Sequence, residues 1–242
     1  MEIKGKVAIV TGGAVRLGQA LALALAKRGA RLVIHYGSSA GPAQELITQI
    51  KSMGSVALAI QADLRQTAEA PTLIARAAEH FGQLDILINS AAIFKPGDWA
   101  DTTEADWDEH MAINLKAPFF LSQAFAAHVG RERPAHIVNV ADWRATRPTA
   151  HHLAYTLTKA ALIAMTQSLA LALAPNIQVN AIAPGAILPP LGQDQAYLDQ
   201  LAQRIPARRT GSPDDVAKAL LFLLDSDFVT GDVIPVTGGE HL

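Results

Sequence analysis

The stretch Thr11-Gly12-Gly13-Ala14-Val15-Arg16-Leu17-Gly18 separates a short apolar run, residues 6–11, from an alanine- and leucine-rich run, residues 17–28. The first run is typical of a buried parallel strand and the second of a helix, so the stretch between them is a strand-to-helix turn. Gly12 and Gly13 permit close approach of a ligand to the backbone, and Gly18 permits close packing of the helix on the sheet. The free N–H groups and partial positive charge at the start of such a helix suit a pyrophosphate. The stretch therefore predicts a dinucleotide-binding turn.

The alternation of strand-like and helix-like runs continues to the end of the chain. Most of the short runs are continuously apolar, as in parallel strands that helices cover on both faces. The predicted strands are 6–11, 31–36, 56–61, 85–89, 136–140, 177–183 and 232–236. The predicted helices are 17–28, 43–53, 71–81, 103–128, 152–174 and 214–224. This order predicts an α/β, single-domain Rossmann fold over residues 1–242, with a doubly wound parallel seven-stranded sheet and helices on both faces.

The composition excludes several classes of protein. Of the 242 residues, 50% are hydrophobic and 17% are charged, which is typical of a globular protein with a large core. The absence of cysteine excludes disulfide scaffolds, thiolate zinc sites, iron–sulfur clusters and cysteine nucleophiles. Twenty basic and 22 acidic residues give a net charge of −2, so the sequence predicts no nucleic-acid partner and no anionic membrane partner.

The apolar runs of the sequence do not resemble a targeting signal or a membrane anchor. The first, residues 7–10, leads into the glycine turn and not into a small-residue cleavage site. The most apolar helical stretch, 20–26, ends at Lys27 and Arg28, far short of the roughly 20 residues that span a bilayer. We therefore expect a soluble cytoplasmic protein that acts on a small molecule.

Residues 186–211 fit the alternation poorly. They contain a Pro-Pro pair, a short polar helix near 194–203, and the pair Arg208-Arg209. Because α/β sheets carry their substrate loops beyond the carboxyl ends of the strands, we expect residues 186–211 to form a substrate loop or lid. Arg208 and Arg209 either order this segment or are solvated.

The end of the second predicted strand indicates which dinucleotide binds. An NAD site normally has an acidic residue there, which binds the ribose 2′-hydroxyl. Here the strand ends in His35-Tyr36-Gly37-Ser38-Ser39, without a carboxylate, and Arg16 stands in the glycine turn. A guanidinium and two hydroxyls match a 2′-phosphate better than a bare ribose. These residues predict NADP(H) over NAD(H).

Tyr155 and Lys159 form the clearest candidate pair for proton chemistry. They are four residues apart near the start of a predicted helix and therefore share one helix face. A tyrosine has a reference pKa of about 10, and a nearby ammonium stabilises the phenolate and brings the pKa toward the working range. The pair alone is common by chance, so its meaning depends on the rest of the chain.

Eight short motifs in order along nearly the whole chain resemble the short-chain dehydrogenase/reductase family. They are Thr11–Gly18, Asp63-Leu64, Asn89-Ser90-Ala91-Ala92, Asn114 within Ile-Asn-Leu, Val138-Asn139-Val140, Tyr155 with Lys159, Asn180-Ala181-Ile182-Ala183-Pro184-Gly185, and Thr230-Gly231 with Gly238-Gly239.

The resemblance implies a role for several positions. Tyr155 would donate the proton, and Lys159 would hold the nicotinamide ribose and tune the tyrosine. Asn114 would anchor a water in the proton relay, and Asp63 would contact the adenine. The resemblance also implies a homotetramer, built through the helices 103–128 and 152–174 and the C-terminal segment.

Combined with the glycine turn and the end of the second strand, the resemblance gives an expected set of cofactor-binding residues. They are Gly12, Arg16, Leu17, His35, Tyr36, Ser38, Ser39, Asp63, Leu64, Asn89, Ser90, Ala91, Tyr155, Lys159, Pro184 and Gly185.

Two departures from the family pattern point to a subfamily. Arg16 replaces the usual third glycine of the turn, and Asp142 replaces the usual active-site serine, 13 residues before Tyr155. Both departures resemble the pteridine reductases, which include bacterial dihydromonapterin and dihydrofolate reductases. Phe94 stands where that subfamily stacks the pterin ring against the nicotinamide. The basic residue that some members carry after the second strand is absent, and Ser38 stands near its place.

The chemistry of Asp142 agrees with this resemblance. A carboxylate beside Tyr155 would raise the tyrosine pKa and keep the phenol protonated as a donor. It would also repel the negative charge that develops on the oxygen of a ketone during reduction, whereas a pterin ring carries both donors and acceptors along its edge. The sequence thus predicts hydride transfer from NADPH to a C=N bond of a dihydropterin, with Arg16, Phe94, Asp142 and Tyr155 at the substrate.

Two other functions remain open from the sequence. One is a carbonyl reductase of the same family that acts on a 3-oxoacyl thioester or a small ketone. The other is a weakly catalytic NADP-binding regulator, against which the intact Asn114, Tyr155 and Lys159 weigh. We expect no metal site, because the adjacent His151 and His152 point apart and no carboxylate cluster accompanies them.

Overall fold

The computed structural model describes residues 1–190 and 192–242 and confirms the predicted fold class. Seven parallel strands form one sheet in the order β3-β2-β1-β4-β5-β6-β7. Every strand ends within one residue of its predicted bounds. The strands are β1 Val7–Val10, β2 Arg31–Tyr36, β3 Ala57–Gln61, β4 Ile86–Asn89, β5 Ala135–Val140, β6 Ile177–Pro184 and β7 Val233–Val236.

The order of the strands reverses between β1 and β4, at the centre of the sheet. Ile9 of β1 lies in register with Val33 of β2 on one side and with Leu87 of β4 on the other. Every residue of β1 and β4 is buried, which explains their continuously apolar character up to Asn89. Because the connections leave β1 and β4 in opposite directions, a crevice opens at their carboxyl ends, where α/β sheets bind ligands.

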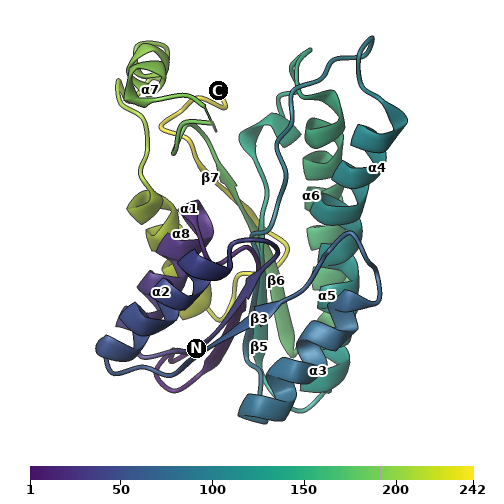
Figure 1. The fold of residues 1–242 in the computed structure, drawn as a ribbon, viewed down its shortest axis with the longest axis vertical. Coiled ribbons are helices and arrows are strands. Elements are labelled where there is room, and N and C mark those ends of the chain that lie inside the picture. The colour runs from purple at the N-terminus through teal and green to yellow at the C-terminus, as the bar shows by residue number, and fades with distance from the viewer. Residues whose placement is uncertain (191) are drawn as a thin grey trace.

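Helices cover both faces of the sheet, as Figure 1 shows. Leu21, Leu46 and Leu220 pack in the core beneath one layer of helices, and Leu73, Leu121 and Phe125 pack beneath the other. The first layer consists of α1 (Arg16–Lys27), α2 (Ala40–Ser52) and α8 (Pro213–Asp225). The second consists of α3 (Glu69–Phe81), α4 (Glu104–Met111), α5 (Ala117–Val129) and α6 (Leu153–Leu173).

The prediction of one continuous helix over 103–128 is wrong. The structure divides it into α4, a π-helical turn over Ala112–Lys116 and α5. Pro118 is the physical cause, because it has no N–H to donate to the carbonyl of Asn114 and its ring crowds that carbonyl. A π-helical turn relieves this conflict, and such turns are frequent at functional sites.

Helix α6 is more apolar than the sequence analysis allows for. Its 21 residues contain an 18-residue window of mean hydropathy 1.3, enough by length and composition to cross a membrane, although the core helix of a soluble protein passes the same test. The structure packs this helix against β6 and buries Leu162, Thr166 and Ala170 along it. The sequence analysis did not consider this helix as a possible membrane span, because it examined only the shorter apolar stretch 20–26.

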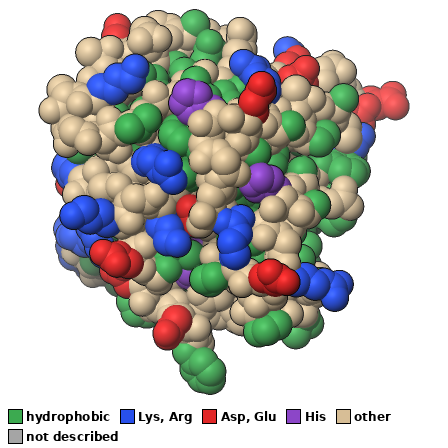
Figure 2. Space-filling model, turned by 90° about the horizontal axis from the view of Figure 1, so that it is seen from below, with side chains coloured by type: hydrophobic (Ala, Val, Ile, Leu, Met, Phe, Trp, Pro, Cys, Tyr) green, Lys and Arg blue, Asp and Glu red, His purple; other side chains and the backbone are tan. Residues whose placement is uncertain are grey.

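The segment after β6 contains one short helix, α7 (Gln195–Ala202), close to the predicted 194–203. Asp194 caps it by accepting a hydrogen bond from the N–H of Ala196. Figure 1 places α7 beyond the carboxyl end of the sheet, near the C-terminus of the chain. The view from below in Figure 2 shows acidic, basic and hydrophobic side chains interspersed on the opposite end of the molecule.

Candidate active site

The glycine turn lies at the crevice and packs tightly on the end of β4. Thr11 Oγ1 accepts hydrogen bonds from the backbone N–H groups of Ser90 (3.0 Å) and Ala91 (3.1 Å). Gly12 has φ +60°, and a Cβ there would lie 2.9 Å from the Cα of Ala91. A Cβ on Gly18 would lie 2.2 Å from the carbonyl oxygen of Gly12. Both positions therefore require glycine, and the shape of the turn is fixed by its contacts.

His35 supports this turn from beneath. The backbone N–H of Gly12 donates to His35 Nδ1 at 3.1 Å, and His35 Nε2 lies 3.1 Å from the carbonyl oxygen of Ala62. The side chain is 3% exposed, and burial lowers its pKa. The sequence analysis assigns His35 to the cofactor, whereas its ring nitrogens in this structure bind the turn and the residue after β3.

The start of α1 fits an anionic dinucleotide. Its N-cap residue, Val15, offers no side-chain acceptor to the first N–H groups, and the first turn contains no acidic residue. These N–H groups and the positive end of the helix dipole are therefore left for a phosphate. Leu17 is half-buried beside them. Tyr36 is the last residue of the adjacent strand β2, and Ser38 and Ser39 follow it.

Arg16 adopts a conformation that favours glycine, with φ +55°. Its exposed side chain donates to the carbonyl oxygen of Pro189 at 2.6 Å. The sequence analysis places this guanidinium at a 2′-phosphate, but in the structure it reaches the segment after β6. A charged residue in a left-handed conformation at the mouth of the crevice is typical of a functional position.

Tyr155 and Lys159 lie on one face of α6 and point to the end of β5. Lys159 Nζ donates to the carbonyl oxygen of Val140 at 2.6 Å and lies 5.6 Å from the centre of the Tyr155 ring. Tyr155 Oη donates to Asp142 Oδ2 at 2.9 Å. Asp142, Tyr155 and Lys159 are up to 17 positions apart in the sequence, and the structure brings them together.

Burial controls the protonation of this group. It raises the pKa of Tyr155 well above its ordinary value, and the charge and hydrogen bond of Asp142 raise it further. Burial also lowers the pKa of Lys159 to about 8, against the opposing effect of Asp142. Tyr155 is thus a protonated donor at neutral pH. Burial and Asp142 outweigh the lowering of its pKa that the sequence analysis expects from Lys159.

Arg144 is a charged residue of the site that the sequence analysis missed. It follows β5 in a short 3₁₀ turn, Trp143–Ala145, which Asp142 caps by accepting from the N–H of Arg144 at 2.8 Å. The guanidinium lies 3.4 Å from Asp142 Oδ1, so the two carboxylate oxygens are divided between Arg144 and Tyr155. Arg144 stands only two residues after Asp142, and this spacing could have indicated that the two side chains interact.

Phe94 lies beside Tyr155, with the two rings edge-on at 4.7 Å between ring centres. The structure also stacks it on His152, at 4.0 Å with 16° between the ring planes. His152 has φ +57° and its Nδ1 lies 2.9 Å from the carbonyl oxygen of Lys95. His152 thus belongs to the wall of the site, which the sequence analysis did not foresee.

The two asparagines of the predicted site serve the framework around it. Asn114 Oδ1 accepts from the N–H of Ile93 at 2.9 Å, and its Nδ2 donates to the Ile93 carbonyl oxygen at 3.0 Å. This pairing fixes the chain just before Phe94. Asn89 is 2% exposed and donates to Asn139 Oδ1 at 2.8 Å, so its side chain joins β4 to β5 and does not line the crevice.

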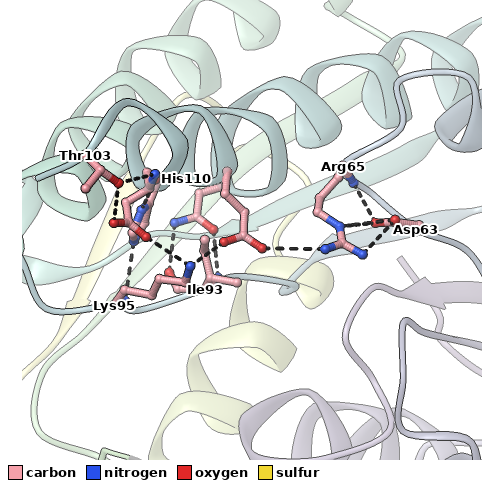
Figure 3. Close-up of polar contacts among 9 residues, drawn as sticks. Asp63, Arg65, Ile93, Lys95, Thr103 and His110 are labelled. Carbon is pink, nitrogen blue, oxygen red and sulfur yellow. Dashed lines mark hydrogen bonds and ion pairs between the residues drawn. The ribbon is translucent and has the colours of Figure 1, made fainter.

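Asp63 belongs to a charged network that begins just after β3 (Figure 3). Arg65 binds both of its carboxylate oxygens, at 2.9 and 3.1 Å from Nε. Arg65 also lies 3.9 Å from Glu109, which pairs with Lys95 at 2.6 Å. The network therefore connects the residues after β3 to the loop that carries Phe94. Leu64 is buried beside Asp63.

The carboxyl end of β6 brings a further carboxylate to the site. Ala186 N–H donates to Glu240 Oε2 at 3.0 Å, and a Cβ on Gly185 would lie 2.5 Å from that oxygen. Burial raises the pKa of Glu240, and the charges of Arg144 and Asp142 act on it as well. The sequence analysis includes Pro184 and Gly185 but misses Glu240, which lies 54 residues beyond Ala186 in the chain.

The segment 186–211 is tied to the fold at its end. Gly211 N–H donates to the carbonyl oxygen of Ala186 at 2.9 Å. Arg209 pairs with Asp215 at 3.0 Å, and Arg208 donates to the Gln203 carbonyl oxygen at 2.6 Å. Both arginines therefore bind within or next to the segment and order its final turn.

The fold, the glycine turn and the Tyr155–Lys159 pair define a dinucleotide-dependent oxidoreductase. A family model described as enoyl-(acyl carrier protein) reductase matches residues 13–241. The chain belongs to the short-chain dehydrogenase/reductase family.

The similar proteins include dehydrogenases and a dihydrofolate reductase. The chain is 37% identical to 2-dehydro-3-deoxy-D-gluconate 5-dehydrogenase of Escherichia coli, covering 98% of this chain and 96% of that protein. It is 36% identical to a short-chain dehydrogenase from Burkholderia cenocepacia solved with NADP, with a TM-score of 0.93 and full coverage of both chains. FolM alternative dihydrofolate reductase 1 from Brucella canis, also solved with NADP, is 30% identical with a TM-score of 0.94, covering 99% of this chain and 95% of that one.

Proposed function

We propose that the protein is an NADPH-dependent reductase that transfers hydride to a C=N bond of a dihydropterin. The observation that carries the proposal is the hydrogen bond from Tyr155 Oη to Asp142 Oδ2, 2.9 Å long, in the position where the family usually has a serine. The proposal extends the family membership to a particular substrate class.

The cofactor would lie across the crevice between the glycine turn and the end of β6. The N–H groups at the start of α1 would bind its pyrophosphate, and Pro184 and Gly185 would flank its nicotinamide ring. Bound NADPH would supply the hydride. The solved structures with NADP from Brucella canis and Burkholderia cenocepacia support this cofactor.

Tyr155 and Asp142 would deliver the proton. Tyr155 is held protonated by burial and by Asp142, so its Oη–H is available to a substrate atom that gains electron density. Asp142 accepts this hydrogen bond in the resting state and orients the phenol. Arg144 neutralises the remaining carboxylate oxygen at 3.4 Å and keeps the carboxylate in place.

The surroundings of Asp142 favour a pterin over a ketone. A carboxylate next to the reacting atom opposes the negative charge that forms on a ketone oxygen. A pterin instead presents N–H donors that a carboxylate accepts and a flat ring that an aromatic side chain contacts. Phe94 is 37% exposed and would provide that contact from its free surface. The likeness to the FolM reductases of Brucella supports the same class.

The second candidate is a carbonyl reductase of the same family. It is favoured by curated relatives, among them a hydroxy(phenyl)methylsuccinyl-CoA dehydrogenase subunit of Thauera aromatica that is 36% identical over 100% of this chain and 99% of that protein. A ketoacyl reductase of Streptomyces violaceoruber is 33% identical over 98% of this chain and 96% of its own length. If the protein is a carbonyl reductase, Asp142 replaces the usual serine of the family without changing the substrate class.

A side-by-side assay separates the two candidates. NADPH oxidation is followed at 340 nm with dihydrobiopterin, dihydrofolate, an acetoacetyl thioester and a simple ketone. We expect turnover with at least one of the two pterins and a much lower kcat/KM with the thioester and the ketone. Turnover of the thioester alone would contradict the proposal.

We further propose a cytoplasmic homotetramer in which residues 186–211 close over the substrate. Phe119, Leu157 and Leu171 are exposed on α5 and α6, and Phe222 is exposed on α8, which supports contacts between copies along these helices. The bond from Arg16 to the Pro189 carbonyl supports a closing movement over the glycine turn. Light scattering in solution tests the tetramer, with a mass four times that of the chain as the expected result.

A further inference from the structure

His35 is a buried titratable side chain that the proposed reaction does not use. It lies on β2, with both ring nitrogens within hydrogen-bond distance of backbone groups of two different segments. One is the N–H of Gly12 in the glycine turn, and the other is the carbonyl oxygen of Ala62 after β3. The side chain is 3% exposed, so water does not compete for either bond.

The two partners determine the tautomer. A backbone N–H can only donate, so Nδ1, at 3.1 Å from Gly12 N, must be unprotonated. A carbonyl oxygen can only accept, so Nε2, at 3.1 Å from Ala62 O, must carry the proton. The neutral Nε2–H form of His35 satisfies both bonds, and a second proton on Nδ1 would face the Gly12 N–H directly.

The turn depends on this bond for its shape. Gly12 packs closely against the residues after β4, because a Cβ added at this position would lie 2.9 Å from Ala91 Cα. Gly13 N–H donates to the backbone carbonyl oxygen of His35 at 3.0 Å, so the same residue holds two successive N–H groups of the turn. Loss of the Nδ1 acceptor would leave the partly buried Gly12 N–H without its partner, which favours rearrangement of the turn.

The surroundings of His35 do not offer a counter-charge to the protonated ring. Strands β1 and β3 carry no titratable residue. Among the charged groups on the neighbouring elements, Asp63 and Arg65 bind each other, Arg16 binds the Pro189 carbonyl oxygen and Arg76 binds the Gln61 carbonyl oxygen. Helix α3 also carries Glu69 and Glu79, and neither is hydrogen-bonded to His35. Burial accordingly lowers the pKa of His35, against the smaller effect of its hydrogen bond to Ala62.

We propose that His35 is a positioning residue that holds the dinucleotide turn in its binding shape and makes NADPH affinity fall on acidification. The inference rests on the proposed function in one respect, the identity of the ligand. Protonation of Nδ1 and binding of the dinucleotide would exclude each other, so acid would weaken binding and bound NADPH would lower the His35 pKa further.

The test compares two substitutions by titration of NADPH fluorescence between pH 8 and pH 5. His35→Leu removes the acceptor, and we expect the dissociation constant at pH 8 to rise at least tenfold. His35→Asn places an oxygen near the position of Nδ1 without a titrating ring, so it should bind more tightly than His35→Leu and lose less affinity than the wild type as the pH falls. The 2′-phosphate of the ligand titrates equally in all variants, so the difference between proteins isolates His35.

Two further measurements keep the test decisive. In the free protein, ¹⁵N NMR of the His35 ring should show an unprotonated Nδ1, and the amide of Gly12 should titrate together with the ring. His136→Asn, which removes a buried histidine at the start of β5, is the matched control and should leave the dissociation constant unchanged. Thermal unfolding establishes that each variant is folded.

The outcomes separate this inference from the proposed function. Wild-type protein that does not bind NADPH would overturn both. NADPH binding that is unchanged in His35→Leu, or a His35 ring that carries its proton on Nδ1, would overturn the inference alone. Dihydropterin reduction plays no part in any of these readouts.

Discussion

At the residue scale, the candidate site consists of a few pairwise contacts around one carboxylate. Asp142 binds Tyr155 with one oxygen and Arg144 with the other, and Glu240 approaches from the end of the chain. Motif spacing predicts Asp142, Tyr155 and Lys159, because each occupies a fixed place in a family pattern. It cannot predict Glu240, whose place at Gly185 and Ala186 arises only when β7 pairs with β6.

We expect Lys159 to set the alkaline limit of activity. Burial lowers its pKa to about 8, so its ammonium loses the proton above that pH and Tyr155 loses its neighbouring cation. We expect kcat/KM for the substrate to fall about tenfold per pH unit above pH 8. Lys159→Arg stays charged over this range and should move the alkaline limb to higher pH, at a lower maximum rate. A wild-type kcat/KM that stays constant up to pH 10 would contradict this role of Lys159.

At the element scale, the strands and most helices follow from the sequence, and the exceptions lie next to the site. The run 103–128 has the apolar periodicity of one helix, but Pro118 and Asn114 impose a π-helical turn in its middle. The short turn Trp143–Ala145 depends on the Asp142 side chain, and a search for long periodic elements overlooks it. Side-chain contacts, which periodicity does not report, decide both features.

Arg16 links two elements, the start of α1 and the segment after β6. Arg16→Gly removes the bond to Pro189 and suits the backbone, whose φ of +55° favours glycine. We expect the free energy of unfolding to stay equal or rise by up to about 1 kcal/mol, because the left-handed strain is relieved.

Substrate binding should become weaker in Arg16→Gly, although the stability of the fold does not fall. We expect the KM for the substrate to rise several-fold in Arg16→Gly, because the segment 186–211 loses its tie to the glycine turn. Lys27→Gly alters the other end of α1 and serves as the control for an effect on the helix alone. A loss of stability with an unchanged KM would show that Arg16 is structural.

At the scale of the whole molecule, the sheet buries a second histidine whose titration opposes folding in acid. His136, at the start of β5, is 2% exposed, and burial and the nearby N-terminal ammonium lower its pKa to about 4. The unfolded chain binds this proton near pH 6.5. Between pH 6.5 and pH 4 the unfolded state therefore holds a proton that the folded state lacks, so stability falls as the pH falls.

This effect has a measurable size. The difference between the two pKa values corresponds to about 3 kcal/mol of unfolding free energy lost between pH 6.5 and pH 4. Urea unfolding at several pH values should show this slope in the wild type and a smaller one in His136→Asn. His80→Asn, at an exposed position on α3, is the control. Equal slopes in His136→Asn and the wild type would contradict the assignment.

The substitution Asp142→Ser tests whether Asp142 gives this protein its proposed preference for dihydropterins. The measurement is the ratio of kcat/KM for dihydropterin to kcat/KM for an acetoacetyl thioester, in the wild type and in Asp142→Ser. We expect the wild type to prefer the pterin and the variant to lose at least about a hundredfold in pterin reduction, the range of one acid–base group. Pterin reduction at the full rate in Asp142→Ser would contradict the account.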